Sequence, residues 1–240
     1  MKIKYFIPDK IKLMIKLFLR YCEGFKYDFA YLKEENMKFE FKISTIQEIK
    51  KGTFFENKKH NIHTGSQKIQ NIILYPNQVF SFWKIIGNPN NKNTFKIGRN
   101  IIKGQVSEEK AGGICQLSSI IYYTAMKANL KIIERHNHSV DIYKEDERFT
   151  PLGGDATVVY GNKDLIFQNN LDFPIRFSFI YESNYINCIL ESKNKINEFD
   201  LEFRREYLDN KIFVKTLINN EIKYKSSYNR INQNNNSFTD

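Results

Sequence analysis

The sequence contains little cysteine, and this scarcity excludes several classes of protein. Cys22, Cys115 and Cys188 lie far apart along 240 residues, and no two of them form a CxxC pair. This spacing predicts neither a disulfide framework nor a zinc ribbon, and the odd number leaves at least one thiol free. Glycine is also sparse, with 11 residues, so a pair of adjacent glycines is a positional signal.

A long uninterrupted apolar segment is also absent. The N-terminal stretch is apolar, but no small-residue cleavage site follows it, and basic residues interrupt it at Lys10, Lys12, Lys16 and Arg20. This pattern predicts neither a readable signal peptide nor a spanning helix, so we expect a cytoplasmic or membrane-peripheral protein. Four apolar residues share one face of a basic amphipathic helix, namely Ile11, Met14, Ile15 and Phe18. Such a face either packs on its own domain or binds an anionic membrane surface.

The net charge is +10, yet no dense basic block and no RNA-binding signature is present. Lysines are spread along the whole chain and mixed with asparagine and isoleucine. This distribution argues against nucleic acid as a partner. A positive surface still fits an acidic cell-wall polymer or anionic lipid.

The length allows one domain with a real core. Aromatic residues make up 15% of the chain and occur in short alternating runs such as "IRFSFIY", which indicate strands. We therefore expect an α+β fold, with a cysteine-bearing helix packed on a mainly antiparallel sheet. The expected parts are a basic helical lead-in over 1–45, a main domain over 46–190, a hairpin extension over 191–230 and a disordered tail over 231–240.

Apolar periodicity and turn residues place the elements. Helices are expected around Ile62 to Ile73, before Pro76, and over 115–128. Residues 88–100 are expected to form a surface loop. Strands are expected over 79–87, 130–143 and 153–161, in several short runs between 164 and 192, and in a hairpin over 211–228.

Cys115 follows two glycines and opens the helix over 115–128. Gly112 and Gly113 let the backbone turn tightly and approach a ligand. A helix start aims free N–H groups at such a ligand and lowers the pKa of a thiol, which favours a nucleophilic thiolate. Gln116, the next residue, is a candidate to assist an oxyanion hole or to cap the helix.

A base and an acid follow the cysteine in the sequence. In a strand over 130–143, His136 and His138 share one face while Arg135 points to the other, so either histidine is a candidate base and Arg135 is structural or contacts substrate. Asp155 follows a Gly-Gly pair and is a candidate to orient the imidazole. The order cysteine, histidine, aspartate is that of papain-like and transglutaminase-like enzymes, although geometry defines a triad.

Other interpretations of these residues remain open. Cys115 alone at a helix start is also typical of a small buried hydrophobe. Cys115, His136 and His138 offer three zinc ligands, but the paired cysteines of zinc sites are absent, so we predict no metal and no cofactor. The segment "AGGICQLSS" lacks the GK[ST] ending of a P-loop.

Four motifs, taken in order, resemble the VanW family, which takes its name from an accessory protein of vancomycin-resistance gene clusters. They are "FSFWKIIG", "AGGICQLSS", "ERHNHS" and "GGDATVVYGNKDLIFQNN", and the resemblance covers roughly residues 60–182. The family pattern has three glycines before the cysteine segment. Here the first of them is Ala111, which restricts the turn but leaves Gly112 and Gly113.

The resemblance implies a bacterial cell-envelope role, as a peptidoglycan L,D-transpeptidase acting on a stem peptide or its precursor. Cys115 would attack the carbonyl of the third stem residue and release D-alanine, with His136 or His138 as base. A side-chain amine of a second stem would then resolve the thioester into a 3-3 cross-link.

Two rival functions remain. The first is a cysteine peptidase or amidase that passes the same acyl group to water, because an acceptor pocket is set by shape rather than by motif. The second is a non-catalytic module that binds cell-wall polymer or its precursor, with Cys115 structural and the positive charge holding acidic groups.

Overall fold

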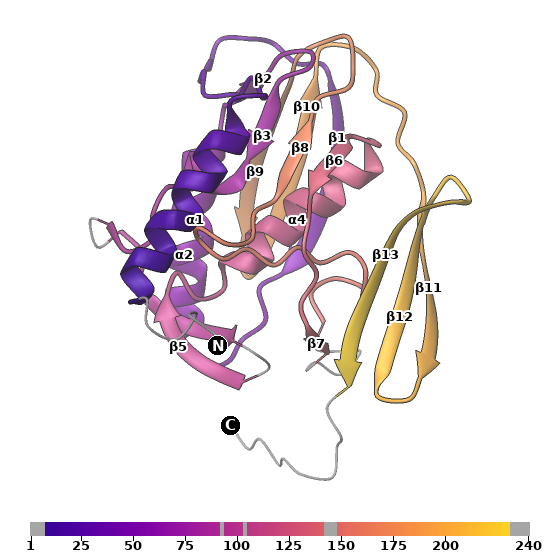
Figure 1. Ribbon diagram of the computed structural model, residues 1–240. Coiled ribbons are helices and arrows are strands. Elements are labelled where there is room, and N and C mark those ends of the chain that lie inside the picture. The colour runs from indigo at the N-terminus through magenta and orange to yellow at the C-terminus, as the bar shows by residue number, and fades with distance from the viewer. Residues whose placement is uncertain (1–7, 92–93, 103–104, 142–147, 231–240) are drawn as a thin grey trace.

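The computed structural model describes residues 8–91, 94–102, 105–141 and 148–230. In these ranges the chain is a mixed α+β protein, which confirms that part of the expected fold class (Figure 1). The helices are α1 (Asp9–Gly24), α2 (Phe55–Ile69), α3 (Phe82–Ile86) and α4 (Ile114–Lys127). None of these helices is long and apolar enough to cross a membrane.

The strands form separate small sheets. The central sheet has the order β1 (Phe41–Glu48), β10 (Tyr185–Ser192), β9 (Ile175–Glu182) and β2 (Ile73–Leu74), and every pair in it is antiparallel. A second sheet joins β3 (Val79–Ser81), β8 (Ile166–Gln168) and β6 (Lys131–Glu134). A hairpin consists of β4 (Ile97–Ile102) and β5 (Gln105–Lys110).

The C-terminal sheet contains β11 (Leu201–Leu208), β12 (Lys211–Ile218) and β13 (Glu221–Arg230). The short strand β7 (Val140–Asp141) pairs in parallel with β13. Figure 1 shows this sheet beside the helical and central-sheet part of the molecule. The parallel pair links the C-terminal sheet to the segment that follows the ERHNH motif.

The core lies between α4 and the central sheet. Helix α4 contacts β1 and β10, and α2 packs beside it. The α4 side chains Leu117, Ile120 and Ile121 are fully buried. Burial of a side chain of this size contributes about 1.5–3 kcal/mol, so this face holds α4, and with it Cys115, in a fixed position.

Several expected elements are present with changed bounds. The 115–128 helix begins one residue earlier, and the 211–228 hairpin corresponds to β12 and β13. The strand expected over 79–87 is wrong beyond Ser81, because the Ser81 hydroxyl accepts from the Lys84 N–H at 3.3 Å and starts α3. The helix expected to reach Ile73 ends at Ile69, and β4 begins inside the expected loop over 88–100. Strand β11 was not anticipated.

Two expected strands are largely absent. The strand over 130–143 stops at Glu134, and only Val140–Asp141 resumes strand pairing before the undescribed residues 142–147. The 153–161 strand is wrong, because only an isolated bridge joins Val159 to Lys163 there. A backbone bond joins the two stretches, from the Thr157 N–H to the His136 carbonyl at 2.7 Å. Side chains of the candidate site bind other backbone groups there, at Asp155 and Ala156.

The N-terminal lead-in has two parts. Helix α1 lies within it, but β1 begins at Phe41 and pairs with β10 in the central sheet. The expected disordered tail over 231–240 lies outside the described residues.

Helix α1 docks through one face and exposes another. Arg20 donates to both carboxylate oxygens of Glu134, at 3.0 and 2.8 Å, and Lys16 donates to Asn162 at 3.1 Å. The apolar residues named above are on the other face, and between 47% and 69% of each is exposed: Ile11, Met14, Ile15 and Phe18. Within the described residues about half or more of each of these side chains stays exposed, which differs from the expectation that this face packs on its own domain.

Candidate active site

Cys115 is the second residue of α4, and the glycines before it shape the start of that helix. Gly113 has a φ of +89°, in the left-handed region that glycine adopts without strain. Gly112 lies against the backbone of Gly98 on β4, where an added Cβ would be 2.2 Å from the Gly98 carbonyl carbon. The close approach at Gly112 is therefore to another strand, whereas the sequence suggested a ligand. Ala111 also has a positive φ, of +63°.

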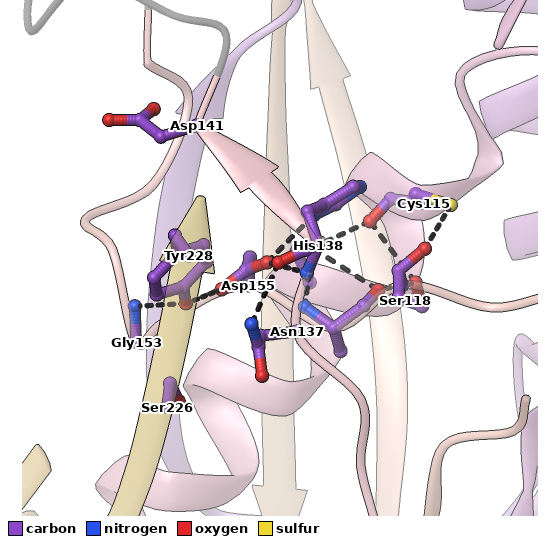
Figure 2. A network of polar contacts seen from close by, with 12 residues as sticks. Cys115, Ser118, Asn137, His138, Asp141, Gly153, Asp155, Ser226 and Tyr228 are labelled. Carbon is purple, nitrogen blue, oxygen red and sulfur yellow. Dashed lines mark hydrogen bonds and ion pairs between the residues drawn. The ribbon is translucent and has the colours of Figure 1, made fainter. Parts of the chain in front are cut away.

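His138 and Asp155 are directly bonded. One Asp155 carboxylate oxygen lies 2.7 Å from His138 Nδ1 and also accepts from the His138 backbone N–H at 2.7 Å. Figure 2 shows His138 between Asp155 and Cys115. With Nδ1 engaged by the carboxylate, Nε2 is the ring nitrogen left for the thiol.

The second Asp155 oxygen binds residues from distant parts of the chain. Arg135 donates to it at 3.0 Å, and the Tyr228 hydroxyl on β13 also donates to it. The side chains of Arg135 and Asp155 are each only 7% exposed, so this is a buried ion pair. The strand alternation that put Arg135 and His138 on opposite faces is wrong here, because this irregular segment directs both side chains to Asp155.

Strand β13 contributes further contacts to the same network (Figure 2). The Gly153 N–H donates to the Tyr228 hydroxyl at 2.7 Å, and Arg135 donates to the Ser226 hydroxyl at 2.6 Å. Sequence reasoning missed Ser226 and Tyr228, because alternating polar residues on a C-terminal strand carry no motif.

The segment after Asp155 is fastened to α4 beside the thiol. The Ser118 hydroxyl donates to the Ala156 carbonyl at 2.6 Å, and the Ala156 N–H donates to the Ser119 hydroxyl at 2.9 Å. Cys115 Sγ then lies 3.6 Å from Thr157 Oγ1 and 3.7 Å from the Val158 carbonyl oxygen. The "CQLSS" segment therefore carries the thiol and also holds the part of the chain that follows Asp155.

Charge and hydrogen bonding favour ionised forms of all three groups. Burial disfavours the charged thiolate, but a hydrogen bond with His138 and the nearby imidazolium bring the pKa of Cys115 below its usual value. Burial likewise opposes charge on His138, yet the bonds to Asp155 and Cys115 raise the pKa of its ring to about 10. The pKa of Asp155 is held well below its usual value, against the effect of burial, by His138 and Arg135.

The other histidine of the motif points elsewhere. His136 Nε2 lies 2.9 Å from Glu134, the same carboxylate that binds Arg20 of α1. His136 therefore belongs to the contact that docks α1, and His138 is the histidine beside Cys115. Among the residues that the structure describes, no group of three histidine, cysteine or acidic side chains is arranged to hold a metal ion.

Gln116 is buried and bound to the end of β1. Its side-chain Nε2 donates to the Glu48 carbonyl at 2.8 Å. The Cys115 N–H, by contrast, has no hydrogen-bond acceptor within the described part of the chain. The backbone N–H of the cysteine is therefore better available to an oxyanion than the Gln116 amide.

Cys115 and His138 line one cavity of about 490 Å³. Its walls come from α2, the β4–β5 hairpin, α4 and the Val158–Tyr160 segment, with Trp83 of α3. The cavity is large enough for a peptide segment, and it brings together a thiol, an imidazole and several cationic side chains.

Comparisons with known proteins agree with the resemblance seen in the sequence. The family model described as "VanW like protein" matches residues 57–190. An uncharacterized protein, YoaR of Bacillus subtilis, is 35% identical over 137 residues, which are 55% of this chain and 44% of YoaR. The vancomycin B-type resistance protein VanW of Enterococcus faecalis is 28% identical over 117 residues, which are 49% of this chain and 42% of that protein.

These matches span less than half of each relative's length. No solved structure gives a significant match.

Proposed function

Because this chain belongs to the VanW family, we propose that it is a cysteine acyltransferase of the cell envelope, which acts on peptidoglycan stem peptides as an L,D-transpeptidase does. The observation that carries this proposal is the row of Cys115, His138 and Asp155, of which Cys115 and His138 line one cavity. A thiolate beside an imidazolium, with a carboxylate on the far ring nitrogen, is the arrangement of cysteine acyl-transfer enzymes.

The first half of the reaction forms a thioester. The Cys115 thiolate attacks the carbonyl carbon of the third stem residue, and the carbonyl electrons move onto oxygen, where the Cys115 N–H is a hydrogen-bond donor. The intermediate then collapses and the bond to the leaving nitrogen breaks. His138 gives its Nε2 proton to that nitrogen, so D-alanine leaves as an amine while Asp155 keeps the proton on Nδ1.

The second half transfers the acyl group. A side-chain amine of another stem attacks the thioester carbonyl, His138 Nε2 accepts the amine proton, and the Cys115 thiolate leaves. The product is a 3-3 cross-link. Such a link does not need the D-alanyl-D-alanine ending that vancomycin binds, which is consistent with the name of the Enterococcus relative, a vancomycin B-type resistance protein.

Hydrolysis of the same thioester is the alternative outcome. The geometry described above serves both reactions, because only the acceptor differs. A binding module with a structural Cys115 is the rival from another class, although burial alone does not account for a thiol whose pKa is lowered.

Intact-mass spectrometry with a tetrapeptide stem ending in D-alanine tests the proposal. We expect a mass gain equal to the stem less D-alanine, absent from Cys115→Ala. His138→Gln should slow formation of the adduct by about 10²- to 10⁴-fold. His136→Gln is the matched control and should leave the rate nearly unchanged.

Added amine acceptor separates transfer from hydrolysis, because only transfer yields a cross-linked product. Binding of the stem with neither adduct nor released D-alanine, from folded protein with a titratable thiol, would establish the binding module and refute the enzyme.

A further inference from the structure

The cavity that holds Cys115 has a cationic wall. The lining includes basic residues from α2, the β4–β5 hairpin and the turn before α2: Lys50, Lys51, Lys58, Arg99 and Lys110. Glu109 is the acidic residue of this lining. Lys50 is paired with Glu48 at 2.6 Å, and Lys51 is exposed to solvent. Lys58, by contrast, packs against Gly113 and is close enough to Arg99 for the charge of Arg99 to act on it.

Lys58 lies beside the start of α4. An added Cβ on Gly113 would be 2.5 Å from Lys58 Cγ, so the lysine stem crosses the glycine that precedes the Cys115 turn. Glycine at that position leaves room for the stem in addition to adopting the left-handed turn. The lysine stem is thereby held against Gly113, which is two positions before Cys115 in the sequence.

Within the described residues neither Lys58 nor Arg99 is joined to a carboxylate by an ion pair, although Glu108 lies opposite Arg99 in the β4–β5 register and Glu109 lines the same cavity. The charged neighbour that acts on the Lys58 ammonium is the Arg99 guanidinium. Burial and the charge of Arg99 lower the pKa of Lys58 to about 8. Holding two like charges together without a counterion is unfavourable. A bound anion relieves this repulsion and supplies the missing acceptor.

We propose that Lys58 and Arg99 form a carboxylate subsite, which recognises the free C-terminal carboxylate of the residue that leaves when Cys115 is acylated. This inference rests on the proposed function, and it defines the substrate class more closely. In a donor that ends one residue after the scissile amide, the carboxylate is on the carbon next to the leaving nitrogen. An anion subsite beside the thiol therefore selects cleavage of the last residue over cleavage within a chain.

Two tetrapeptide stems that differ only in a free or an amidated C-terminus test the subsite. Binding is measured by calorimetry with Cys115→Ala protein, so that no turnover occurs. We expect the acid to bind about 10- to 100-fold more tightly than the amide, the range for hydrogen bonds to charged groups. Lys58→Met should remove this preference, and Lys58→Arg should restore most of it.

Lys59→Met is the matched control, because Lys59 is on the same helix and, unlike Lys58, does not line the cavity; its ammonium lies over the ring of Phe55. It should keep the preference for the acid. Arg99→Met should weaken binding of the acid by a smaller factor, about 2- to 5-fold, because Arg99 is exposed. Equal binding of acid and amide, binding of neither, or equal losses in Lys58→Met and Lys59→Met would overturn the subsite.

The two proposals fail in different ways. A mass adduct on wild-type protein that forms equally fast from acid and amide supports the acyltransferase and refutes the subsite. A preference for the acid in Cys115→Ala, without any adduct on the wild-type protein, supports the subsite and refutes the acyltransferase.

Discussion

At the scale of single residues, the ionisation of Cys115 is the property that separates a nucleophile from a buried thiol. The other two cysteines provide the contrast within one chain. Cys188 is fully buried and burial raises its pKa to about 12, whereas Cys22 is exposed on α1. Only Cys115 combines partial burial with an imidazolium partner.

The pH dependence of alkylation tests this difference. In a Cys22→Ser variant, we expect iodoacetamide to modify Cys115 with a midpoint below the ordinary thiol pKa of 9.0, because a lowered pKa means that thiolate is present at lower pH. Asp155→Asn removes the group that keeps His138 protonated, so the midpoint should move up toward 9.0. The rate is followed by mass spectrometry. A midpoint at or above 9.0 in the Cys22→Ser protein would refute the ion pair.

Residue types and order were enough to name candidates for the site, but not to choose among all of them. Cys115, His138 and Asp155 were candidates from the sequence, and they lie together. The choice between His136 and His138 was beyond the sequence, because it depends on Glu134 being engaged by Arg20 of α1. The role of Tyr228 could not be predicted from the sequence either, because only the packing of β13 brings that hydroxyl to Asp155.

At the scale of elements, β13 acts as a support for the site. The Tyr228 hydroxyl donates to Asp155 and accepts from the buried Gly153 N–H, so it satisfies two groups at once. We expect Tyr228→Phe to lower the free energy of unfolding by about 1–3 kcal/mol, because it leaves a buried donor unsatisfied. Chemical denaturation measures this loss.

Tyr207→Phe on β11 is the control for that change. Tyr207 is 58% exposed, and the substitution keeps its ring, so the free energy of unfolding should stay within about 0.5 kcal/mol of the wild type. A similar loss in both variants would mean that the Tyr228 hydroxyl has no special role.

Elements with a strong apolar period were predicted well, and those held by side chains were not. Helix α4 was expected almost to the residue because its apolar face is periodic and buried. The segments 135–138 and 155–158 looked like strands because their residues alternate. Only the bond from the Thr157 N–H to the His136 carbonyl joins these two segments through the backbone. Other backbone groups there bind side chains instead, namely those of Arg135, Asn137, Ser118 and Ser119.

Helix α1 presents an apolar face that suits an anionic membrane surface. At 100° per residue, Lys10 and Lys12 fall on the two edges of the exposed face that contains Met14 and Phe18. We expect the protein to sediment with vesicles that contain anionic lipid and not with neutral vesicles. The double variant Met14→Ser and Phe18→Ser should weaken this binding at least about 10-fold.

Replacement of Tyr31 by serine is the control for an exposed aromatic residue outside α1. It should leave vesicle binding unchanged. Equal binding to neutral and anionic vesicles would contradict the role of the lysines, and no binding to either would exclude the membrane as the partner of this face.

At the scale of the whole molecule, the candidate site depends on parts of the chain that lie far apart in sequence. The family match ends at residue 190, yet β13 contributes Ser226 and Tyr228 to the Arg135–Asp155 network. Helix α1, which precedes the match, holds Glu134 through Arg20. The C-terminal sheet and α1 therefore belong to the same structural unit as the matched region.

The buried charges should also give the whole molecule a defined pH profile of stability. The pKa of Asp155 is lowered from 3.8, so its contribution is present above that value and is lost as the pH falls. The pKa of His138 is raised from 6.5 to about 10, so its contribution is complete below 6.5 and is lost as the pH rises toward 10. Together the two shifts predict greatest stability between these ordinary values.

Denaturation of Cys115→Ala protein from below pH 3.8 to about pH 10 measures the profile without titration of the thiol. Its loss of stability at high pH should begin at a lower pH than in the wild type, because Cys115 no longer helps to raise the pKa of His138. Asp155→Asn in the same background should flatten the profile, since the substitution removes both the depressed carboxylate and the main partner that raises the His138 pKa. It should also lower stability at its maximum by about 3–5 kcal/mol, because Arg135 is left as a buried charge without its partner. An unchanged profile in Asp155→Asn would mean that the Arg135–Asp155–His138 network does not control the stability of the fold.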